Sequence, residues 1–200
     1  MNPSSGLDPS TPSENSRPVT DSSLWIALNP DYAAWIKIPG TIIDYPYVRS
    51  KDNKDYLKRD FYGKYSEAGT LFQDYRNLGN FNDPHTLIYG HNMKNKTMFH
   101  SLTLFKDPVF LADHDLIEWS SLYETRTYKI FSVYEISADD YAFTLQFDSE
   151  ASYSAYLNAL AAQSLHPSAL ISATGQKLLT LVTCSYGTNN GRMVIHALEL

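Results

Sequence analysis

The sequence has little cysteine and no long apolar run. Only one of its 200 residues is a cysteine, which excludes an intrachain disulfide and a zinc site built from several cysteines. No apolar stretch approaches the roughly 18 residues that a membrane-spanning helix needs. The first residues lack both a basic and an apolar region, so we predict no signal peptide. We therefore expect the chain as given to be soluble.

Clusters of positive charge are also missing. Lysine and arginine number 16 against 22 aspartates and glutamates, and basic residues form nothing longer than short pairs such as Lys58-Arg59. Because a nucleic-acid surface needs a basic patch, we expect no nucleic-acid partner. Phosphate-binding loops, dinucleotide fingerprints and a recognised spacing of calcium ligands are absent too. The sequence therefore predicts neither a cofactor nor a metal site.

What is present indicates a mainly β protein. Residues 1–21 are polar and rich in Ser, Pro and Thr, which predicts a disordered tail or linker, whereas residues 22–200 are enough for one ordinary domain. Short apolar and β-branched runs predict seven or eight strands, with three short helices and no βαβ rhythm. This pattern favours a mixed β-barrel with helical insertions over a doubly wound sheet.

The three helices are predicted from capping residues and apolar spacing. An N-terminal helix is capped by Ser22-Ser23. A second helix begins near Thr97, and Pro108 is predicted to end it. A third is capped by Asp148 or Ser149, and its apolar residues recur at the i, i+3, i+4, i+7 positions of one helix face.

The strongest chemical feature lies near the end of the chain. The apolar run 178–184 ends in the lone cysteine, Cys184, and after a polar loop a second apolar run opens with Arg192. Such runs predict a hairpin that brings these two residues together. A thiolate nucleophile needs a positive neighbour or a base, and an arginine fork can hold an oxyanion. The alternative is a buried, inert thiol beside an arginine that makes a surface salt bridge.

A base for this thiol has to come from six histidines. His196 shares the face of Arg192 but lies roughly 13 Å further along the strand at ~3.3 Å per residue, which favours a packed histidine. His91 follows a predicted buried strand, and Gly90 permits an unusual backbone turn just before the ring. A histidine on a turn at the end of a core strand suits a general acid or base. Three others are interpreted as surface residues: His100, His114 and His166.

Several motifs occur in the same order as in one known family. Leu181-Val182-Thr183-Cys184, followed after a loop by Arg192, matches an (L/V)-x-T-C…R signature, and residues 86–93 match a segment that carries a catalytic histidine. In these features the chain resembles sortases, the surface cysteine transpeptidases of Gram-positive bacteria. Residues 29–46 and the helix at about 149–164 resemble class B of that family.

The resemblance implies a fold and a site. The fold is an eight-stranded β-barrel with an N-terminal helix and short helical insertions. Cys184 would be the nucleophile, His91 the acid and base, and Arg192 the group that stabilises the oxyanion or the substrate carbonyl. Substrate contacts are expected at positions in the groove, beside the nucleophile and in a neighbouring loop: Asn53, Leu57, Val182, Thr183, Tyr141 and Phe143.

The resemblance also implies substrates and a location. A C-terminal sorting signal of a secreted protein would be cleaved at a Thr-X bond, and an amine of peptidoglycan or of a pilin would resolve the thioester. The domain would be monomeric and would work on the outer face of the cell membrane, held by an N-terminal anchor outside this chain. A cysteine peptidase or hydrolase on the same fold stays open, as does a non-catalytic surface binding module with an inert Cys184.

Overall fold

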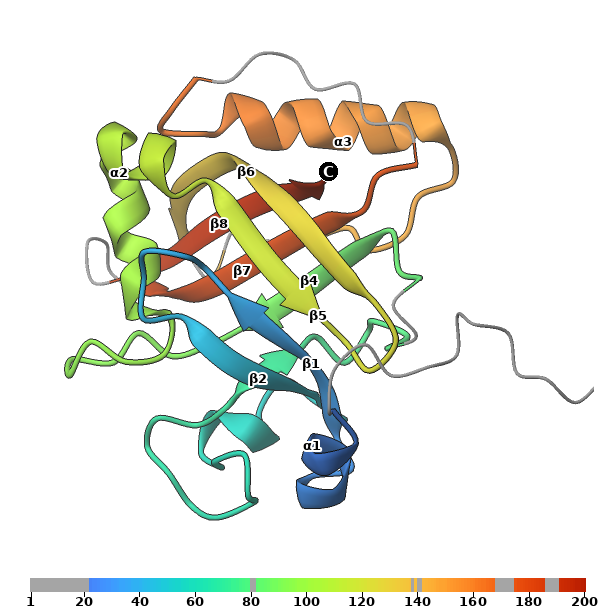
Figure 1. The fold of residues 1–200 in the computed structure, drawn as a ribbon. Helices are drawn as coiled ribbons and strands as arrows, with labels where there is room; N and C mark the ends of the chain where they lie inside the picture. Colours follow the sequence, from blue (N-terminus) through green and yellow to red (C-terminus); the bar gives the residue numbers. More distant parts are fainter. Residues whose placement is uncertain (1–21, 80–81, 138, 140–141, 168–174, 186–190) are drawn as a thin grey trace, which may run out of the picture.

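The structure is a computed structural model that describes residues 22–79, 82–137, 139, 142–167, 175–185 and 191–200. The predicted tail, residues 1–21, lies outside these ranges. Within them, eight strands close into one barrel in the order β1-β2-β3-β4-β7-β8-β6-β5 (Figure 1). The predicted mainly β barrel is therefore confirmed. The strands are β1 (Tyr32–Lys37), β2 (Asp44–Arg49), β3 (Leu71–Gln73), β4 (His85–Tyr89), β5 (Leu116–Ser120), β6 (Thr125–Ser137), β7 (Leu178–Ser185) and β8 (Gly191–Glu199).

Short helices are inserted between the strands. The α-helices are α1 (Ser22–Leu28), α2 (Pro108–Asp113) and α3 (Glu150–Ala162), and the 3₁₀ helices are η2 (Asp55–Leu57) and η3 (Phe99–Lys106). Helix α3 begins with the predicted cap, because the Ser149 side chain accepts the N–H of Ser152 in a capping box. The prediction at Pro108 was incomplete. This proline also begins α2, since Asp107 caps the N–H of Val109 and a proline at the first helical position needs no donor.

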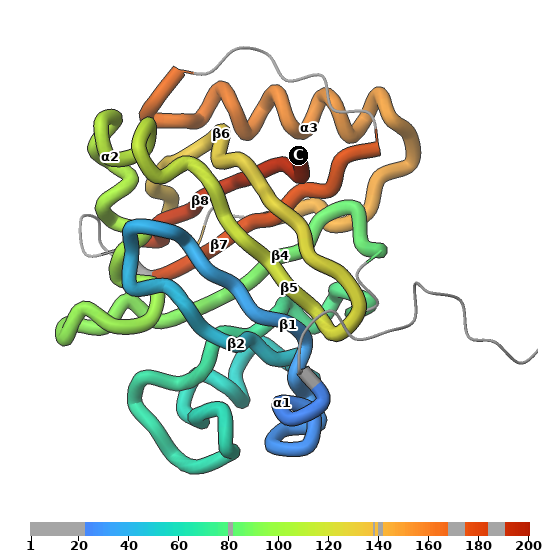
Figure 2. The backbone as a smooth tube through the Cα atoms, in the orientation of Figure 1, coloured from blue at the N-terminus to red at the C-terminus, as the bar shows by residue number. Residues whose placement is uncertain are grey.

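Strand alternation divides the barrel into an interior and an outer face. Leu181 of β7 and Ile195 of β8 belong to the interior core. Their neighbours in sequence, Val182 and Val194, pack together on the outer face. Helix α3 covers part of this outer face, where its Leu160 belongs to a buried cluster that also contains residues of β7 and β8 (Figures 1 and 2). The neighbouring strands β4, β7 and β8 are thus buried on both sides over most of their length.

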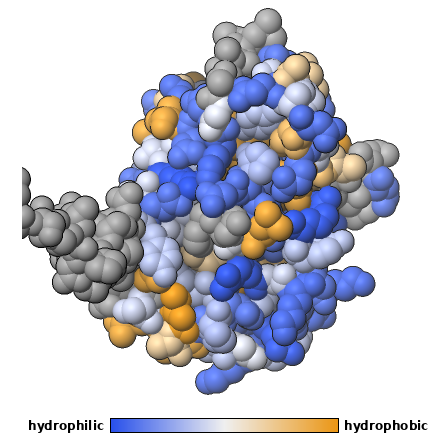
Figure 3. Space-filling model, turned by 90° about the vertical axis from the view of Figure 1, so that its right-hand side faces the viewer, coloured by the Kyte–Doolittle hydropathy of each residue, from blue (hydrophilic) through white to orange (hydrophobic). Residues whose placement is uncertain are grey.

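Helix α1 lies at one end of the barrel, beside β1 and β2 (Figure 2). Its Trp25 packs against the cluster that contains Tyr32 and Phe61, whereas Leu24 and Leu28 remain exposed. Among the described helices, none combines the length and the apolar character needed to cross a bilayer. The face shown in Figure 3 is mainly hydrophilic, and its apolar atoms form separate patches.

Candidate active site

The end of β7 and the start of β8 meet at one end of the barrel. The two strands are antiparallel neighbours, and their register pairs the Cα atom of Cys184 with that of Arg192. Paired Cα atoms in such a ladder lie about 4.5–5.5 Å apart. The predicted pairing is therefore confirmed for the backbone. The side chain of Cys184 lies outside the described part of the structure.

His91 reaches this end of the barrel from another strand. β4 runs parallel to β7 and pairs Tyr89 with Val182, and the N–H of Gly90 continues the ladder to the Val182 carbonyl at 3.1 Å. The carbonyl oxygen of His91 then accepts the N–H of Phe99, at the start of η3, at 2.9 Å. The backbone of His91 is thus held on both sides, next to the strand that carries Cys184.

Gly90 is required by space and not by the predicted backbone turn. It is not among the glycines with a positive φ angle. A Cβ atom at this position would come within 2.3 Å of a methyl carbon of Leu71 and within 2.7 Å of the ring of Phe99. The expectation of an unusual turn was wrong. The missing side chain instead lets two core residues pack against the backbone just before His91.

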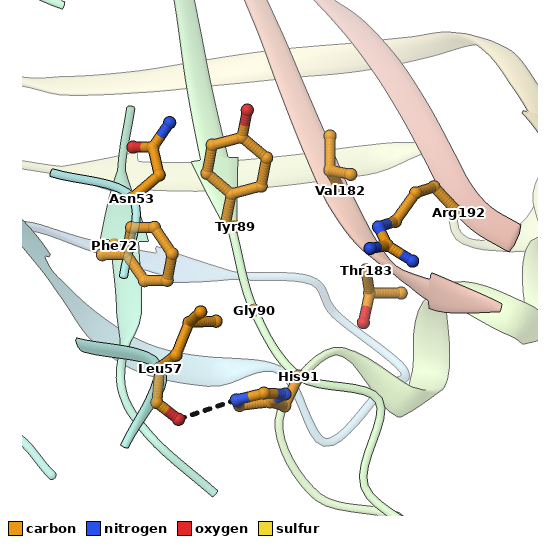
Figure 4. A pocket seen from close by; sticks show the side chains of 9 residues that line it. All are labelled: Asn53, Leu57, Phe72, Tyr89, Gly90, His91, Val182, Thr183 and Arg192. Atoms are coloured by element: carbon orange, nitrogen blue, oxygen red, sulfur yellow. Dashed lines mark hydrogen bonds between the residues drawn. The ribbon is translucent and has the colours of Figure 1, made fainter. Parts of the chain in front are cut away.

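The half-buried imidazole of His91 has one nitrogen in a defined hydrogen bond. Its Nε2 lies 2.7 Å from the carbonyl oxygen of Leu57 in η2 (Figure 4). A carbonyl can only accept, so Nε2 carries a hydrogen whether the ring is neutral or charged. The lone pair of the neutral ring is then on Nδ1. A hydrogen-bond donor or an acid can therefore be met by this neutral ring only at Nδ1.

A pocket with a volume of about 160 Å³ lies beside these groups. Four residues predicted as substrate contacts share this pocket with His91 and Arg192, although their role toward a substrate stays a prediction. Its walls come from the loop after β2, from η2 and from four strands of the barrel. The lining residues are Asn53, Leu57, Phe72, Tyr89, Gly90, His91, Val182, Thr183 and Arg192 (Figure 4).

Thr183 contributes a buried hydroxyl to the pocket wall. The residue is 2% exposed, and its Oγ1 has no hydrogen-bond partner among the described residues. Leaving a buried polar group without a partner costs about 1–3 kcal/mol. A bound molecule with a polar group at this wall would supply the missing partner.

One of the remaining predicted contacts lies elsewhere, the other is outside the described residues, and two pocket residues were not predicted. Phe143 is buried and packs with Leu87 on the outer face of the barrel instead of lining the pocket. Tyr141 lies outside the described residues. Phe72 and Tyr89 line the pocket, although the sequence indicated only that they belong to strands. The position of Tyr89, two residues before the candidate catalytic histidine, was the one signal that pointed to it.

The other histidines are structural. His196 is completely buried with both ring nitrogens in hydrogen bonds, which confirms the prediction of a packed histidine. Those predicted as surface residues are half-buried instead, because each ring packs against or bonds to a neighbour. The contacts are His100 with the side chain of Asn92, His114 with the ring of Phe110, and His166 with the carbonyl of Phe105.

Known proteins share both the sequence and the fold. Residues 36–200 match the sequence profile of the sortase domain. The chain belongs to the sortase family. Sortase B of Listeria monocytogenes is 37% identical over 170 residues, which cover 84% of this chain and 69% of that protein. The X-ray structure of Clostridium perfringens sortase B has a TM-score of 0.85 at 35% identity, covering 90% of this chain and 99% of that one. A Staphylococcus aureus sortase B–substrate complex has a TM-score of 0.83 at 28% identity, covering 92% and 87%.

These relatives decide the class and the general activity. Both the curated relative and the solved structures are of sortase B, and the eight-stranded barrel agrees with theirs, so the chain is a class B member of the family. Membership makes it an enzyme, a transpeptidase of the Gram-positive cell surface.

Proposed function

We propose that this transpeptidase uses Cys184 to cleave a sorting-signal peptide at a Thr-X bond and transfers the acyl part to an amine. The observation that carries the proposal is the register of β7 and β8, which pairs Cys184 with Arg192 beside the pocket that also contains His91. A nucleophile, a proton carrier and a fixed positive charge at one site are the parts that acyl transfer requires.

The first half of the reaction forms a thioester. The Cys184 thiolate attacks the carbonyl carbon of the threonine, and the carbon–nitrogen bond to residue X then breaks. The charged His91 ring gives its Nδ1 proton to the leaving amine, while Nε2 stays bonded to the Leu57 carbonyl. The bond to Leu57 thus keeps the ring oriented while the other nitrogen changes its protonation.

The second half reverses these roles. An incoming amine attacks the thioester carbon and loses a proton to Nδ1 of the neutral His91. The carbon–sulfur bond breaks, a new amide forms, and the thiolate and the charged ring are restored. Arg192 stabilises the negative oxygen of both tetrahedral intermediates, because its guanidinium stays charged and offers several N–H donors.

The pocket is proposed to hold the residues of the sorting signal. Asn53, Leu57, Val182 and Thr183 line it, and the buried Oγ1 of Thr183 supports a polar contact with the bound peptide. The substrate complex of the related Staphylococcus aureus sortase B supports a peptide substrate for this chain as well. The peptide would come from a secreted protein, and the amine from peptidoglycan or from a pilin. The enzyme would act as a monomer, anchored on the outer face of the membrane.

The main test is a peptide-library assay with and without an added amine. The wild-type domain is expected to release the fragment after the cleaved bond and to join the remainder to the amine. Cys184→Ala should give neither product. If Cys184→Ala kept full activity, the proposal would be overturned. If only hydrolysed peptide formed in excess amine, a cysteine peptidase would replace the transpeptidase assignment.

Arg192→Lys tests the role of the guanidinium. Lysine keeps the charge but loses the planar fork, so kcat should fall by about 10²–10³, the usual effect of losing an oxyanion donor. Arg59→Lys is the matched control, since Arg59 lies on the surface in an ion pair with Asp55. An Arg192→Lys variant as active as this control would remove Arg192 from the mechanism.

A further inference from the structure

A buried carboxylate lies directly behind one wall of the pocket. Asp74 follows β3 and is 1% exposed. Its backbone N–H bonds to the carbonyl of Leu87, so the residue is fixed to β4. None of the roles proposed above uses this charge. A buried charge is retained only when it is paired and hydrogen-bonded, and the partners of Asp74 therefore indicate what it does.

Two of these partners are pocket residues. The Nδ2 of Asn53 donates to Asp74 Oδ2 at 3.1 Å, and the hydroxyl of Tyr89 donates to the same oxygen at 3.0 Å. Asn53 and Tyr89 come from a loop and from a strand, and both line the pocket (Figure 4). One carboxylate oxygen therefore joins two walls of the pocket.

The bond to Asp74 also decides which way the Asn53 amide points. Its Oδ1 accepts the backbone N–H of Tyr75 at 3.1 Å, while its Nδ2 donates to Asp74. An amide rotated by 180° would place N–H against N–H and oxygen against carboxylate, so only one orientation satisfies both partners. The face that Asn53 presents to the pocket is thus set by groups outside it.

Arg76 completes the arrangement from the far side. Its Nε and Nη2 bond to the two oxygens of Asp74 at 2.8 and 3.0 Å, and its Nη1 donates to the carbonyl of Phe143 at 3.3 Å. Burial alone would raise the pKa of the Asp74 carboxyl, but the hydrogen bonds and the charge of Arg76 outweigh it and hold that pKa below its ordinary value. The carboxylate is therefore ionised and accepts from every donor around it.

We propose that Asp74 is a positioning residue for the peptide-binding pocket, which it shapes by fixing Asn53 and Tyr89, and that Arg76 holds it in place. The inference rests on the proposed function, because it concerns how the same pocket holds its peptide. Among the described residues, the carboxylate of Asp74 bonds to Asn53, Arg76 and Tyr89 and not to His91 or Arg192. Its loss should weaken peptide binding and leave the reactivity of the thiol unchanged.

Asp74→Asn is the principal variant. The new amide has one oxygen and one NH₂ group, and in either orientation the NH₂ group faces donors that the carboxylate satisfied. We expect KM for a sorting peptide to rise about tenfold, the effect of losing one hydrogen bond to a charged group, with kcat changed by less than about twofold. The rate at which iodoacetamide alkylates Cys184 should equal that of the wild type.

Asp83→Asn is the matched control. Asp83 is also a buried carboxylate, 2% exposed, but it accepts the backbone N–H groups of Leu78 and Gly79 and does not line the pocket. The Asp83→Asn substitution should lower the stability of the protein without changing KM for the peptide. If Asp74→Asn does not fold, Arg76→Lys removes the fork that holds Asp74 and should raise KM in the same direction.

A double-mutant cycle shows whether Asp74 acts by positioning Asn53 or whether its loss weakens the whole fold. If Asp74 acts through Asn53, adding Asp74→Asn to Asn53→Ala should change KM much less than it does in the wild-type background. Full additivity would overturn the inference, as would an equal KM for the Asp74→Asn and Asp83→Asn variants. A wild-type domain that processes no sorting peptide would instead overturn the proposed function, so the two failures are distinct.

Discussion

Histidines lie at two places beside the strands β4, β7 and β8: His85, at the start of β4, and His196, in β8, form what we call the middle region, and His91 lies just after the end of β4. In the middle, His85 and His196 are completely buried, and all four of their ring nitrogens are in hydrogen bonds. At the end, His91 is half-buried beside a pocket, with Nε2 bonded to Leu57. The same side chain is a structural element in one region and the proposed proton carrier in the other. Burial and the number of fixed partners make this difference.

In the middle region the hydrogen bonds form one directed chain. The Nδ1 of His85 donates to the Thr144 carbonyl at 2.6 Å, so the Nε2 of the neutral ring accepts from Thr180 at 2.7 Å. Thr180 then accepts from Nδ1 of His196 at 2.6 Å, and Nε2 of His196 accepts from Tyr134 at 2.9 Å. Every hydrogen has one place, and both rings are neutral. Burial lowers the pKa of His85 to about 4 and that of His196 well below its ordinary value.

The largest expected effect comes from replacing histidine by glutamine in each of the two regions. His91→Gln should lower kcat/KM by about 10²–10⁴, the usual contribution of a general acid and base, with little change in the melting temperature. His196→Gln should do the reverse, because it breaks the buried chain and leaves the pocket intact. Peptide ligation per folded molecule and thermal unfolding, measured on both variants, check this. Equal losses of activity would show that the two regions do not divide the roles in this way.

Acid should destabilise the protein through the middle region. His85 has a folded-state pKa of about 4 against an ordinary value of about 6.5, so the unfolded chain binds more protons between these values. The stabilisation is complete above pH 6.5 and declines as the pH falls toward 4, by about 3 kcal/mol in total for this group. His196 acts in the same direction. Urea unfolding at several pH values measures the decline, which His85→Gln should flatten. A free energy of unfolding that stays constant from pH 7 to 4.5 would contradict the neutral chain.

A smaller effect is expected when either of two threonines of β7 is replaced by valine. Thr180→Val leaves Nε2 of His85 and the Nδ1 hydrogen of His196 without their partner, and should lower the free energy of unfolding by about 2 kcal/mol. Thr183→Val removes a buried hydroxyl that has no partner among the described residues, so it should raise the free energy of unfolding by about 1 kcal/mol or more. Urea unfolding of both variants gives the difference. A Thr183→Val variant as unstable as Thr180→Val would mean that the Thr183 hydroxyl is paired in solution.

The pairing of Cys184 with Arg192 was predictable because it is local. Two apolar runs around a polar loop have few other ways to fold, and an antiparallel hairpin sets the register within a residue or two. Distance along a strand likewise excluded His196 from the neighbourhood of Cys184. The number of residues between them, multiplied by the rise per residue of a β-strand, was enough for that conclusion.

His91 could not be assigned from its local sequence alone. It lies near Cys184 because β4 runs parallel to β7, and parallel neighbours are joined by long connections that local patterns do not predict. Resemblance to sortases supplied this contact, because it places the histidine segment and the cysteine strand in one site. The reason for Gly90 was also missed, since the crowding that requires it comes from Leu71 and Phe99.

Asp74 was not identified because nothing in its own segment marks it. Its partners Asn53, Arg76 and Tyr89 come from three segments that meet only in the folded barrel. The start of α2 was missed for a different reason. A proline such as Pro108 is compatible both with the end of one helix and with the first position of the next. The capping residue Asp107 just before it was the local feature that indicated a new helix.

The sequence by itself determined the strand-rich class, the hairpin that joins Cys184 to Arg192, and the family to which the motifs belong. These depend on alternation, turn residues and spacing, which act over a few residues. Only the tertiary structure decided that His91 bonds to the Leu57 carbonyl, that His85 is buried in a chain of hydrogen bonds, and which carboxylate stands behind the pocket wall. Those properties depend on burial and on partners from distant segments, and both arise only when the barrel closes.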